Sequence, residues 1–363
     1  MSHPFKFYAA EISYFSAKVR PALRYKDVHY RELLPDYRGV ILPRTGLAFI
    51  PIVITPEDET WQDTSAILDT LEARLPAPPL YPTTPVQRVV AYLVELYADE
   101  FMLLPAMHYR WSFPESVAKA RADFASNSPD PATAERFAAR MQGSLPFLGV
   151  TPATAPAIEA HLRDLLAALS AHFAAHPYVL GERMSLADCA LMGPLYAHLY
   201  LDAVPGRLLR ETAPAVCRWI ERMNHPDPEA PGAWLADDAL APTLRPILSL
   251  IGADAVPMIL DGLRAFETWA DAQPPEMIEP PRGVGGHESK LRGVAMQRFT
   301  SAYTPWMAQR PLDQYRALDA AARAAVDRAL AGTGCAALLG HAPRHRVGKR
   351  RFTLVLEGRG GPG

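Results

Sequence analysis

The stretch Phe49–Leu75, FIPIVITPEDETWQDTSAILDTLEARL, constrains the fold more than any other part of the chain. It reads as a short apolar strand that begins at a proline, a turn, a second strand and an amphipathic helix. Because proline has no N–H to donate to a sheet, Pro51 predicts a turn or a cis peptide bond at the start of the strand. The triplet Asp63-Thr64-Ser65 opens the helix, and helix N-termini of this kind bind carboxylates readily.

The overall composition indicates an ordinary globular protein. The chain has 363 residues, of which 49% are apolar and 21% charged, and its formal net charge is -2. This length suits two or three domains, and the near-zero charge favours neither nucleic acid nor an anionic membrane as a partner. No apolar run approaches the length of a membrane span, and residues 1–10 lack the pattern of a secretory leader. We therefore expect a cytoplasmic protein.

The cysteines exclude one class of chemistry. Cys189, Cys217 and Cys335 are too few and too scattered for a disulfide framework, and none precedes residue 189. An N-terminal domain without a thiol cannot carry out thiol–disulfide exchange through its own side chains. Glutaredoxin-type activity of that domain is therefore excluded.

The first eighty residues alternate between strand and helix patterns. Strands are expected at 5–10, 28–33, 49–54 and near 60–61, and helices at 16–27, with Ser16 as N-cap, and from 64 to about 74. A stiff linker with five prolines follows at 76–85.

Beyond the linker nearly everything reads as helix. The clearest helices are 86–104 and 155–175, and Ser185 with Asp188 has the spacing of a capping box. In the remaining residues, 226–363, we expect helices at 240–251, 255–272 and 314–331 and a strand-like tail. Between them the segment QPPEMIEPPRGVGGHES is expected to be an extended surface loop.

Two motifs in the first domain resemble the glutathione transferase superfamily. Ser13-Tyr14-Phe15, followed by Lys18-Val19-Arg20, resembles the Ser-x-x-x-x-Arg/Lys-Val-Arg opening of its serine-type members. Ile50-Pro51 resembles the cis-proline dipeptide of the same family.

Two further motifs follow in the family's order. Asp63-Thr64 with Ala66-Ile67 resembles the Glu-Ser-x-Ala-Ile of the family's glutathione site, and GERMSLAD at 181–188 resembles the capping-box helix of its second domain. The resemblance covers about residues 5–225 and implies an α+β fold: a thioredoxin-like domain at 1–80, an all-α domain at 86–225 and a helical extension at 226–363.

The resemblance also implies roles for individual residues. The backbone of Ile50, next to Pro51, would pair with the cysteinyl part of glutathione. Asp63 would hold the γ-glutamyl amino group, and Thr64 with the helix N-terminus would hold its carboxylate. The Ser13 hydroxyl would donate to the sulfur and favour the thiolate.

Several positions depart from the family pattern. Asp63-Thr64 replaces the usual Glu-Ser, and Ala48 with Phe49 replaces the usual Gly-Lys or Gly-Gln before the cis-proline dipeptide, so a contact to the glycyl carboxylate is missing unless Arg44 supplies it. Tyr14 and Tyr8 are rivals of Ser13 as the hydroxyl that faces the sulfur, with Ser13 favoured over Tyr14 and Tyr14 over Tyr8.

Three other motifs suggest chemistry less specifically. His172 and His176 are four residues apart but lack an H-E-x-x-H pattern, so no metal site is expected. The run at 283–287 lacks the arrangement of a phosphate-binding loop. The basic residues at 344–351 are interpreted as a solvated surface rather than a phosphate site.

These expectations define a function. We expect a cytosolic, homodimeric glutathione transferase-like enzyme of detoxification, which adds the glutathione thiolate to small apolar electrophiles without a metal. Tyr109 and Trp111 are candidate residues of the electrophile pocket. The alternative is a non-catalytic binding or assembly module with the same fold, and a peroxidase-type or dehaloperoxidase-type side activity stays open without a residue to carry it.

Overall fold

A computed structural model describes residues 4–128 and 130–359, and these form two compact units. Unit 1 contains residues 1–82, 109–142 and 169–235, and unit 2 contains residues 83–108, 143–168 and 236–363. Residues 1–3 and 360–363, at the ends of the first and third expected domains, lie outside the described residues. The boundaries of the three expected domains stay a prediction.

Unit 1 begins with a four-stranded mixed sheet. The strands are β1 (Phe5–Tyr8), β2 (Tyr30–Leu33), β3 (Ile52–Ile54) and β4 (Thr60–Gln62), in the order β2-β1-β3-β4. β1 is parallel to β2 and antiparallel to β3, and β3 is antiparallel to β4. This is the thioredoxin-like arrangement expected from the sequence.

Helices cover this sheet and complete unit 1. The helix α1 packs against α3, α10, α12 and the π-helical segment η3. The helical elements of unit 1 are η1 (Tyr37–Ile41), α1 (Tyr14–Tyr25), α2 (Leu42–Thr45), α3 (Thr64–Arg74), α6 (Pro114–Ser126), α7 (Pro131–Gly143), α10 (Leu186–Met192), η3 (Gly193–Tyr200), α11 (Ala203–Thr212) and α12 (Pro214–Asn224). Two further helices, α5 (Leu103–Trp111) and α9 (Ala155–Ala175), contribute residues to both units.

The cores follow the expected apolar spacing. Phe7 of β1, Val19 and Leu23 of α1 and Ile67 of α3 are fully buried. The predicted helix at 155–175 is confirmed as α9, and its leucine stripe is buried. The capping box of α10 is also confirmed, because Ser185 and Asp188 bond each other's backbone reciprocally.

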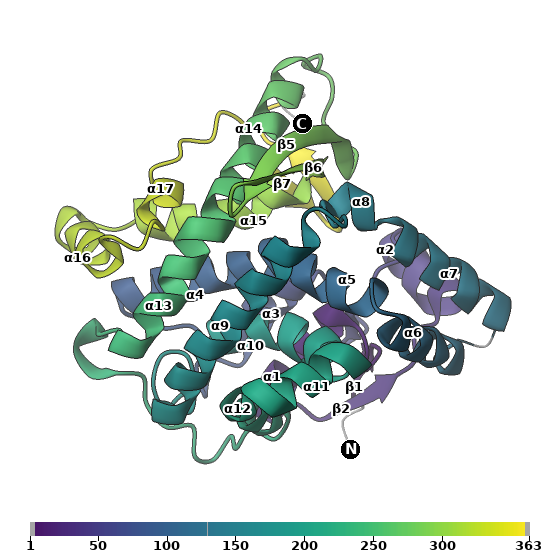
Figure 1. The fold of residues 1–363 in the computed structure, drawn as a ribbon, viewed down its shortest axis with the longest axis horizontal. Coiled ribbons are helices and arrows are strands. Elements are labelled where there is room, and N and C mark those ends of the chain that lie inside the picture. Colours follow the sequence, from purple (N-terminus) through teal and green to yellow (C-terminus); the bar gives the residue numbers. More distant parts are fainter. Residues whose placement is uncertain (1–3, 129, 360–363) are drawn as a thin grey trace. The chain divides into compact units, whose positions relative to one another are not determined.

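Unit 2 is built on a helix of the middle region together with the C-terminal residues. Its elements are α4 (Pro85–Leu96), η2 (Tyr97–Phe101), α8 (Leu145–Leu148), η4 (Ala236–Asp238), η5 (Pro242–Leu244), α13 (Arg245–Leu250), η6 (Ile251–Ala255), α14 (Val256–Asp271), β5 (Gly283–Leu291), β6 (Val294–Ser301), α15 (Tyr303–Arg316), α16 (Ala320–Leu330), α17 (Ala336–Leu339), β7 (Val347–Arg350) and β8 (Thr353–Leu356). α15 and α16 pack against α4, and the hairpin β5–β6 packs against α14 (Figure 1).

Polar contacts join α4 to the C-terminal residues within unit 2. Glu95 of α4 is fully buried and accepts a hydrogen bond of 2.8 Å from Nε of Arg310 on α15. His161 of α9 contacts Tyr97 at 2.7 Å and Asp254 at 2.7 Å, and Arg292 donates to the same Asp254 carboxylate at 2.8 Å. These buried networks tie residues 236–363 into a shared core.

Three expectations about the elements were wrong. The run at 283–287, expected in a surface loop, lies in strand β5, and the extension contains the hairpins β5–β6 and β7–β8 besides helices. The expected single helix at 314–331 is two helices, α15 and α16. The first helix starts at Tyr14 with Ser13 as its N-cap, whereas Ser16 was expected to cap it.

One helical run meets the length and composition of a membrane span, although none was expected. Residues 242–271 form this run, and 67% of its most apolar window is buried inside the protein. Such burial is what the core helix of a soluble protein has, so the run is weak evidence for a membrane.

Candidate functional site

One end of the sheet gathers the sequence-predicted site residues. Tyr8, Ile52 and Gln62 form a single row across β1, β3 and β4. The chain leaves β1 after Tyr8, enters β3 at Ile52 and leaves β4 after Gln62. The segments with Ser13, Ile50-Pro51 and Asp63-Thr64 therefore lie at the same end of the sheet, within unit 1.

Ser13 is the N-cap of α1. Its hydroxyl oxygen accepts a hydrogen bond from the Ser16 N–H at 3.3 Å, and the residue is half-buried. A hydroxyl that accepts this bond still has its own proton to donate. The capping role is therefore compatible with a hydrogen bond from Ser13 to a ligand.

The Ile50-Pro51 peptide bond is cis, which confirms the expectation for this dipeptide. Pairing of β3 begins only at Ile52. Among residues 4–128 and 130–359, no hydrogen bond takes the backbone N–H or C=O of Ile50. One donor and one acceptor of the main chain thus remain for a peptide-like ligand.

Asp63 is the N-cap of α3, as the sequence predicts. Its Oδ1 accepts a hydrogen bond from the Ala66 N–H at 3.1 Å, and its φ of 77° lies in a region that non-glycine residues rarely adopt. Such a backbone conformation costs about 1–3 kcal/mol, and residues that adopt it cluster at functional sites. Thr64, the next residue, is 4% exposed.

A buried lysine supports the start of α3, and the sequence reasoning assigned it no role. Lys18 of α1 is fully buried, and its Nζ donates to Oγ of Ser65 at 2.9 Å. This contact places a positive charge next to the N-terminus of α3, which itself attracts anions. Lys18 was part of the motif that includes Val19 and Arg20, but its position on the buried face of the helix is what reveals its contact with Ser65.

The two rival hydroxyls lie in different surroundings. The Tyr14 ring is 4% exposed and contacts His198 edge-on, with ring centroids 5.3 Å apart. Tyr8 is half-buried and packs with Ile50 against the apolar cluster of Ile41 and Ile52. The order of preference among the three hydroxyls stays a prediction.

Arg44, the candidate partner of a glycyl carboxylate, is engaged by the protein. Its guanidinium donates to Oδ1 of Asp58 at 2.6 Å and to Oγ1 of Thr60 at 3.1 Å. A ligand carboxylate would have to compete with Asp58 for this group.

Tyr109 and Trp111 are buried rather than exposed on a surface. Their side chains are 3% and 2% exposed. The Tyr109 ring stacks on Phe113 at 5.2 Å, and the Trp111 ring stacks on Phe124 at 6.0 Å. The proposed role of both residues in an electrophile pocket stays a prediction, and their packing also gives them a part in the core.

The protein's own thiols are buried and favour the protonated form. Cys189, Cys217 and Cys335 are buried, and burial raises the pKa of each thiol, that of Cys335 to about 11. Among the described residues, no group of three or more His, Cys, Asp or Glu side chains could hold a metal ion. This end of the sheet instead offers the N-termini of α1 and α3, the Asp63 carboxylate and the unpaired backbone of Ile50. Together these groups suit a small peptide that has a carboxylate and an ammonium group.

Two family models match the chain. Residues 7–79 match "Glutathione S-transferase, N-terminal domain", and residues 139–227 match "Glutathione S-transferase, C-terminal domain". The first match contains the Ser13, Ile50 and Asp63 segments. No curated protein sequence matches the chain.

Several solved structures are similar to parts of the chain. A glutathione S-transferase from Rhodospirillum rubrum F11 is 17% identical and covers 67% of this chain and 91% of its own, with a TM-score of 0.42. The beta-etherase LigF from Sphingobium sp. strain SYK-6 is 15% identical, with 67% and 98% covered and a TM-score of 0.43. A glutathione S-transferase from Methylobacterium radiotolerans, in complex with glutathione sulfonate, is 20% identical, with 66% and 100% covered and a TM-score of 0.39.

Proposed function

Because this chain belongs to the glutathione S-transferase superfamily, we propose that it binds glutathione at the end of the sheet in unit 1 and transfers its thiolate to small apolar electrophiles. The observation that supports this most is that the segments with Ser13, Ile50 and Asp63 all adjoin one row of the sheet, formed by Tyr8, Ile52 and Gln62. Ser13, Ile50 and Asp63 each offer the chemical group that one part of glutathione requires.

The proposed contacts follow from those groups. The unpaired N–H and C=O of Ile50 pair with the cysteinyl backbone of glutathione, which lies beside Ile50 as an added strand lies beside a sheet. The N-terminus of α3, together with Thr64, receives the γ-glutamyl carboxylate, and the Asp63 carboxylate receives the ammonium group. Buried Lys18 adds positive charge beside that helix start.

Catalysis in this proposal needs only a positioned and stabilised nucleophile. The Ser13 O–H donates to the glutathione sulfur and lowers the pKa of its thiol, and each unit of lowering corresponds to about 1.4 kcal/mol. Binding thiolate and electrophile together supplies the rest through proximity. No residue of the protein forms a covalent intermediate. We also propose a homodimer in the cytoplasm.

A non-catalytic module with the same fold is the second candidate. The observation that favours it is the capping bond between Ser13 and Ser16, which accounts for Ser13 without any chemistry. The engagement of Arg44 by Asp58 favours it as well, because one expected ligand contact is then missing.

Retention on immobilised glutathione, followed by turnover with a panel of small electrophiles, separates these candidates. Retention with release of conjugate supports the transferase. Retention without turnover of any electrophile supports the binding module. A folded protein that flows through the column and forms no conjugate would overturn the transferase and leave a binding or assembly module that does not use glutathione.

A further inference from the structure

Arg110 of α5 holds the main chain directly before Ser13. Its Nη1 donates a hydrogen bond of 3.0 Å to the carbonyl oxygen of Ile12. The N–H of the same peptide unit, which belongs to Ser13, donates to the carbonyl oxygen of Ala10 at 3.0 Å, and the Ser13 carbonyl oxygen accepts the Ala17 N–H at 3.0 Å. The peptides on both sides of Ser13 are thus bonded, which fixes the direction in which its side chain leaves the backbone.

The guanidinium of Arg110 is itself held in place. Its Nε donates to Oδ2 of Asp202 at 2.7 Å, and its Nη2 donates to Oδ1 of the same carboxylate at 3.3 Å and to the carbonyl oxygen of Ala197 at 2.6 Å. Arg110 and Asp202 are 2% and 1% exposed. A buried planar group with two contacts to one carboxylate cannot turn freely, so its Nη1 offers a donor in one fixed direction.

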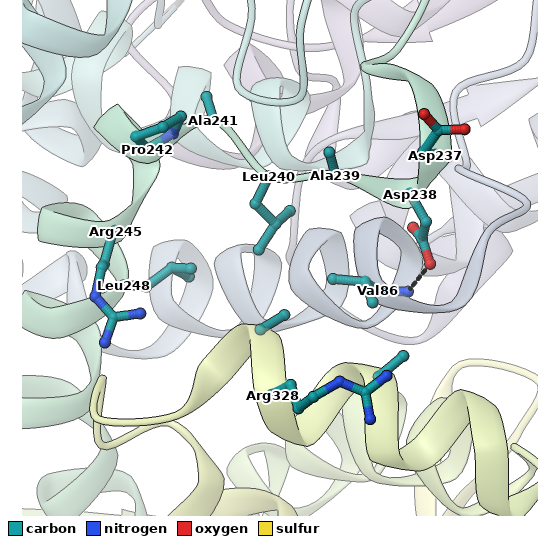
Figure 2. A pocket seen from close by; sticks show the side chains of 12 residues that line it. Val86, Asp237, Asp238, Ala239, Leu240, Ala241, Pro242, Arg245, Leu248 and Arg328 are labelled. Carbon is teal, nitrogen blue, oxygen red and sulfur yellow. Dashed lines mark hydrogen bonds between the residues drawn. The ribbon is translucent and has the colours of Figure 1, made fainter.

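Asp202 contacts Arg110 instead of capping a helix. An aspartate at the start of a helix commonly accepts N–H groups of the first turn. Asp63 does so on α3, and Figure 2 shows a similar contact in unit 2, where Asp238 accepts the Val86 N–H at the start of α4 at 2.8 Å. Asp202 occupies the N-cap of α11, but in the described chain its side chain accepts no hydrogen bond from that helix. Its carboxylate is turned toward Arg110.

Stability alone is a weak reason for this buried ion pair. The cost of taking two charges out of water offsets most of their attraction, and apolar side chains of similar size often stabilise a core equally well. What a guanidinium adds is a set of donors at fixed angles. In this protein one of those donors reaches the residue before the proposed catalytic hydroxyl.

The hydroxyl proton of Ser13 is the group whose direction this arrangement determines. The Ser13 oxygen accepts the Ser16 N–H at 3.3 Å, and among residues 4–128 and 130–359 no hydrogen bond takes the hydroxyl proton. A hydrogen bond to the glutathione sulfur requires this O–H to point at the sulfur. Misplacement of a reacting group by about 1 Å can lower a rate about a hundredfold, so a fixed backbone at Ser13 has a direct use.

We propose that Arg110 is a positioning residue of the transferase reaction: it fixes the orientation of Ser13 through Ile12, and Asp202 orients Arg110. Arg110 contacts neither the thiol nor the electrophile and acts on the thiolate only through Ser13. This inference rests on the proposed function and adds to it a residue that lies between the two segments matched by the family models.

Two variants test the proposal beside a matched control. Arg110→Lys keeps a positive charge for Asp202 but lacks the planar group that reaches three acceptors at once. Arg110→Met combined with Asp202→Val removes both charges, so no buried carboxylate is left without a partner. Arg222→Met is the control, because Arg222 also donates to a main-chain carbonyl in unit 1, that of Pro177 at 2.9 Å. Circular dichroism of each variant checks that the fold is retained.

Hydrogen exchange without glutathione tests the positioning by itself. Residues 9–17 include the N–H groups of Ser13 and Ser16, both of which are hydrogen-bonded. These groups should exchange at least tenfold faster in both Arg110 variants than in the wild type, and Arg222→Met should match the wild type. Exchange as slow as in the wild type in the double variant, which has no donor left for Ile12, would overturn the proposal.

The pH dependence of conjugate formation tests the effect on the thiol. With saturating glutathione, both Arg110 variants should be about tenfold slower than the wild type at about pH 6.5, and nearly as fast at about pH 9.5, where the thiol ionises without help. The Kd for glutathione should change less than twofold, because Ile50 and Asp63 are untouched. In a Ser13→Ala background, the Arg110 variants should cause no further loss.

Two kinetic results would contradict this role. An equal loss of rate at both pH values, or full additivity with Ser13→Ala, would mean that Arg110 acts through the fold and not through Ser13. The two proposals can also fail separately. A wild type that binds no glutathione would overturn the transferase and the role of Arg110 in its chemistry, whereas normal turnover with unchanged hydrogen exchange in the double variant would overturn only the role of Arg110.

Discussion

At the scale of single residues, Ser13 has one role that the structure shows and a second that we propose. Its oxygen caps α1 through the Ser16 N–H, and in the proposed mechanism its proton faces the glutathione sulfur. The cap alone stabilises a protein by about 0.5–2 kcal/mol. Any variant of Ser13 therefore changes stability and thiol chemistry together, unless the replacement preserves one of them.

Three variants of Ser13 distinguish the roles. Ser13→Ala should lower the unfolding free energy by about 1 kcal/mol and raise the pKa of bound glutathione. Ser13→Asp should keep the stability, because aspartate caps well, yet raise that pKa at least as much, because a carboxylate has no proton to donate. Ser13→Thr should preserve both. Urea denaturation and the pH dependence of conjugate formation measure the two quantities. A thiol pKa that is the same in all three variants would exclude Ser13 as the activating hydroxyl.

The residue scale is also where sequence reasoning was least complete. Asp63 was predicted as cap and ligand, but its positive φ could not be read from an Asp-Thr-Ser triplet, because it depends on how β4 delivers the chain to α3. The contact between Lys18 and Ser65 joins residues 47 apart and was missed for the same reason. Motifs identified the segments of the site, and tertiary packing determined their contacts.

At the scale of elements, the sequence predicted the helices that have a clear apolar stripe or a capping motif. The leucine stripe predicted α9, and Ser185 with Asp188 predicted the start of α10. Strand β5 was missed because its glycines have little strand propensity, and it forms through pairing with β6, where the register shifts between Gly283 and Gly286. The first cap was misplaced because Ser13 and Ser16 are both good caps.

The capping box of α10 should make stability depend on pH. Asp188 is fully buried and accepts hydrogen bonds from Val179, Ser185 and Trp219. Burial nevertheless raises the pKa of its carboxyl group to about 6. Because this is above the unfolded value of about 3.9, the folded state binds the proton more tightly, and the stabilising contribution is complete below pH 4 and lost as the pH rises through 6.

Urea denaturation between pH 4 and pH 7 tests this expectation. The contribution should amount to about 3 kcal/mol. Asp188→Asn cannot titrate, so its unfolding free energy should lack this pH-dependent contribution. The variant should be less stable at every pH, because one amide N–H of asparagine would face a hydrogen-bond donor. Parallel pH profiles of the wild type and Asp188→Asn would show that Asp188 has an ordinary pKa.

At the scale of the whole molecule, the C-terminal residues share a core with the middle helices of unit 2. The ion pair between Glu95 and Arg310 joins positions 215 residues apart, and the side chains are 0% and 10% exposed. The sequence predicted helices on both sides but not this pairing, because nothing local in either helix specifies its distant partner.

Removing one member of this pair should destabilise unit 2. Arg310→Met leaves the Glu95 carboxylate buried without its partner, which typically costs about 3–5 kcal/mol. The double variant Glu95→Leu with Arg310→Met should recover most of that loss, since both charges are then gone. Urea denaturation of both variants measures the effect. A loss below about 1 kcal/mol for Arg310→Met alone would mean that the pair does not hold the C-terminal residues in place.

The central claim is glutathione binding at the end of the sheet, and calorimetric titration of Asp63→Asn beside the wild type tests it most directly. Asparagine keeps the cap of α3 and tolerates the positive φ, so only the charge is lost. The account predicts that the wild type binds glutathione and that Asp63→Asn binds it at least tenfold more weakly. An analogue of glutathione without the γ-glutamyl ammonium should bind the two proteins equally. No heat from the folded wild type at millimolar glutathione would contradict the account.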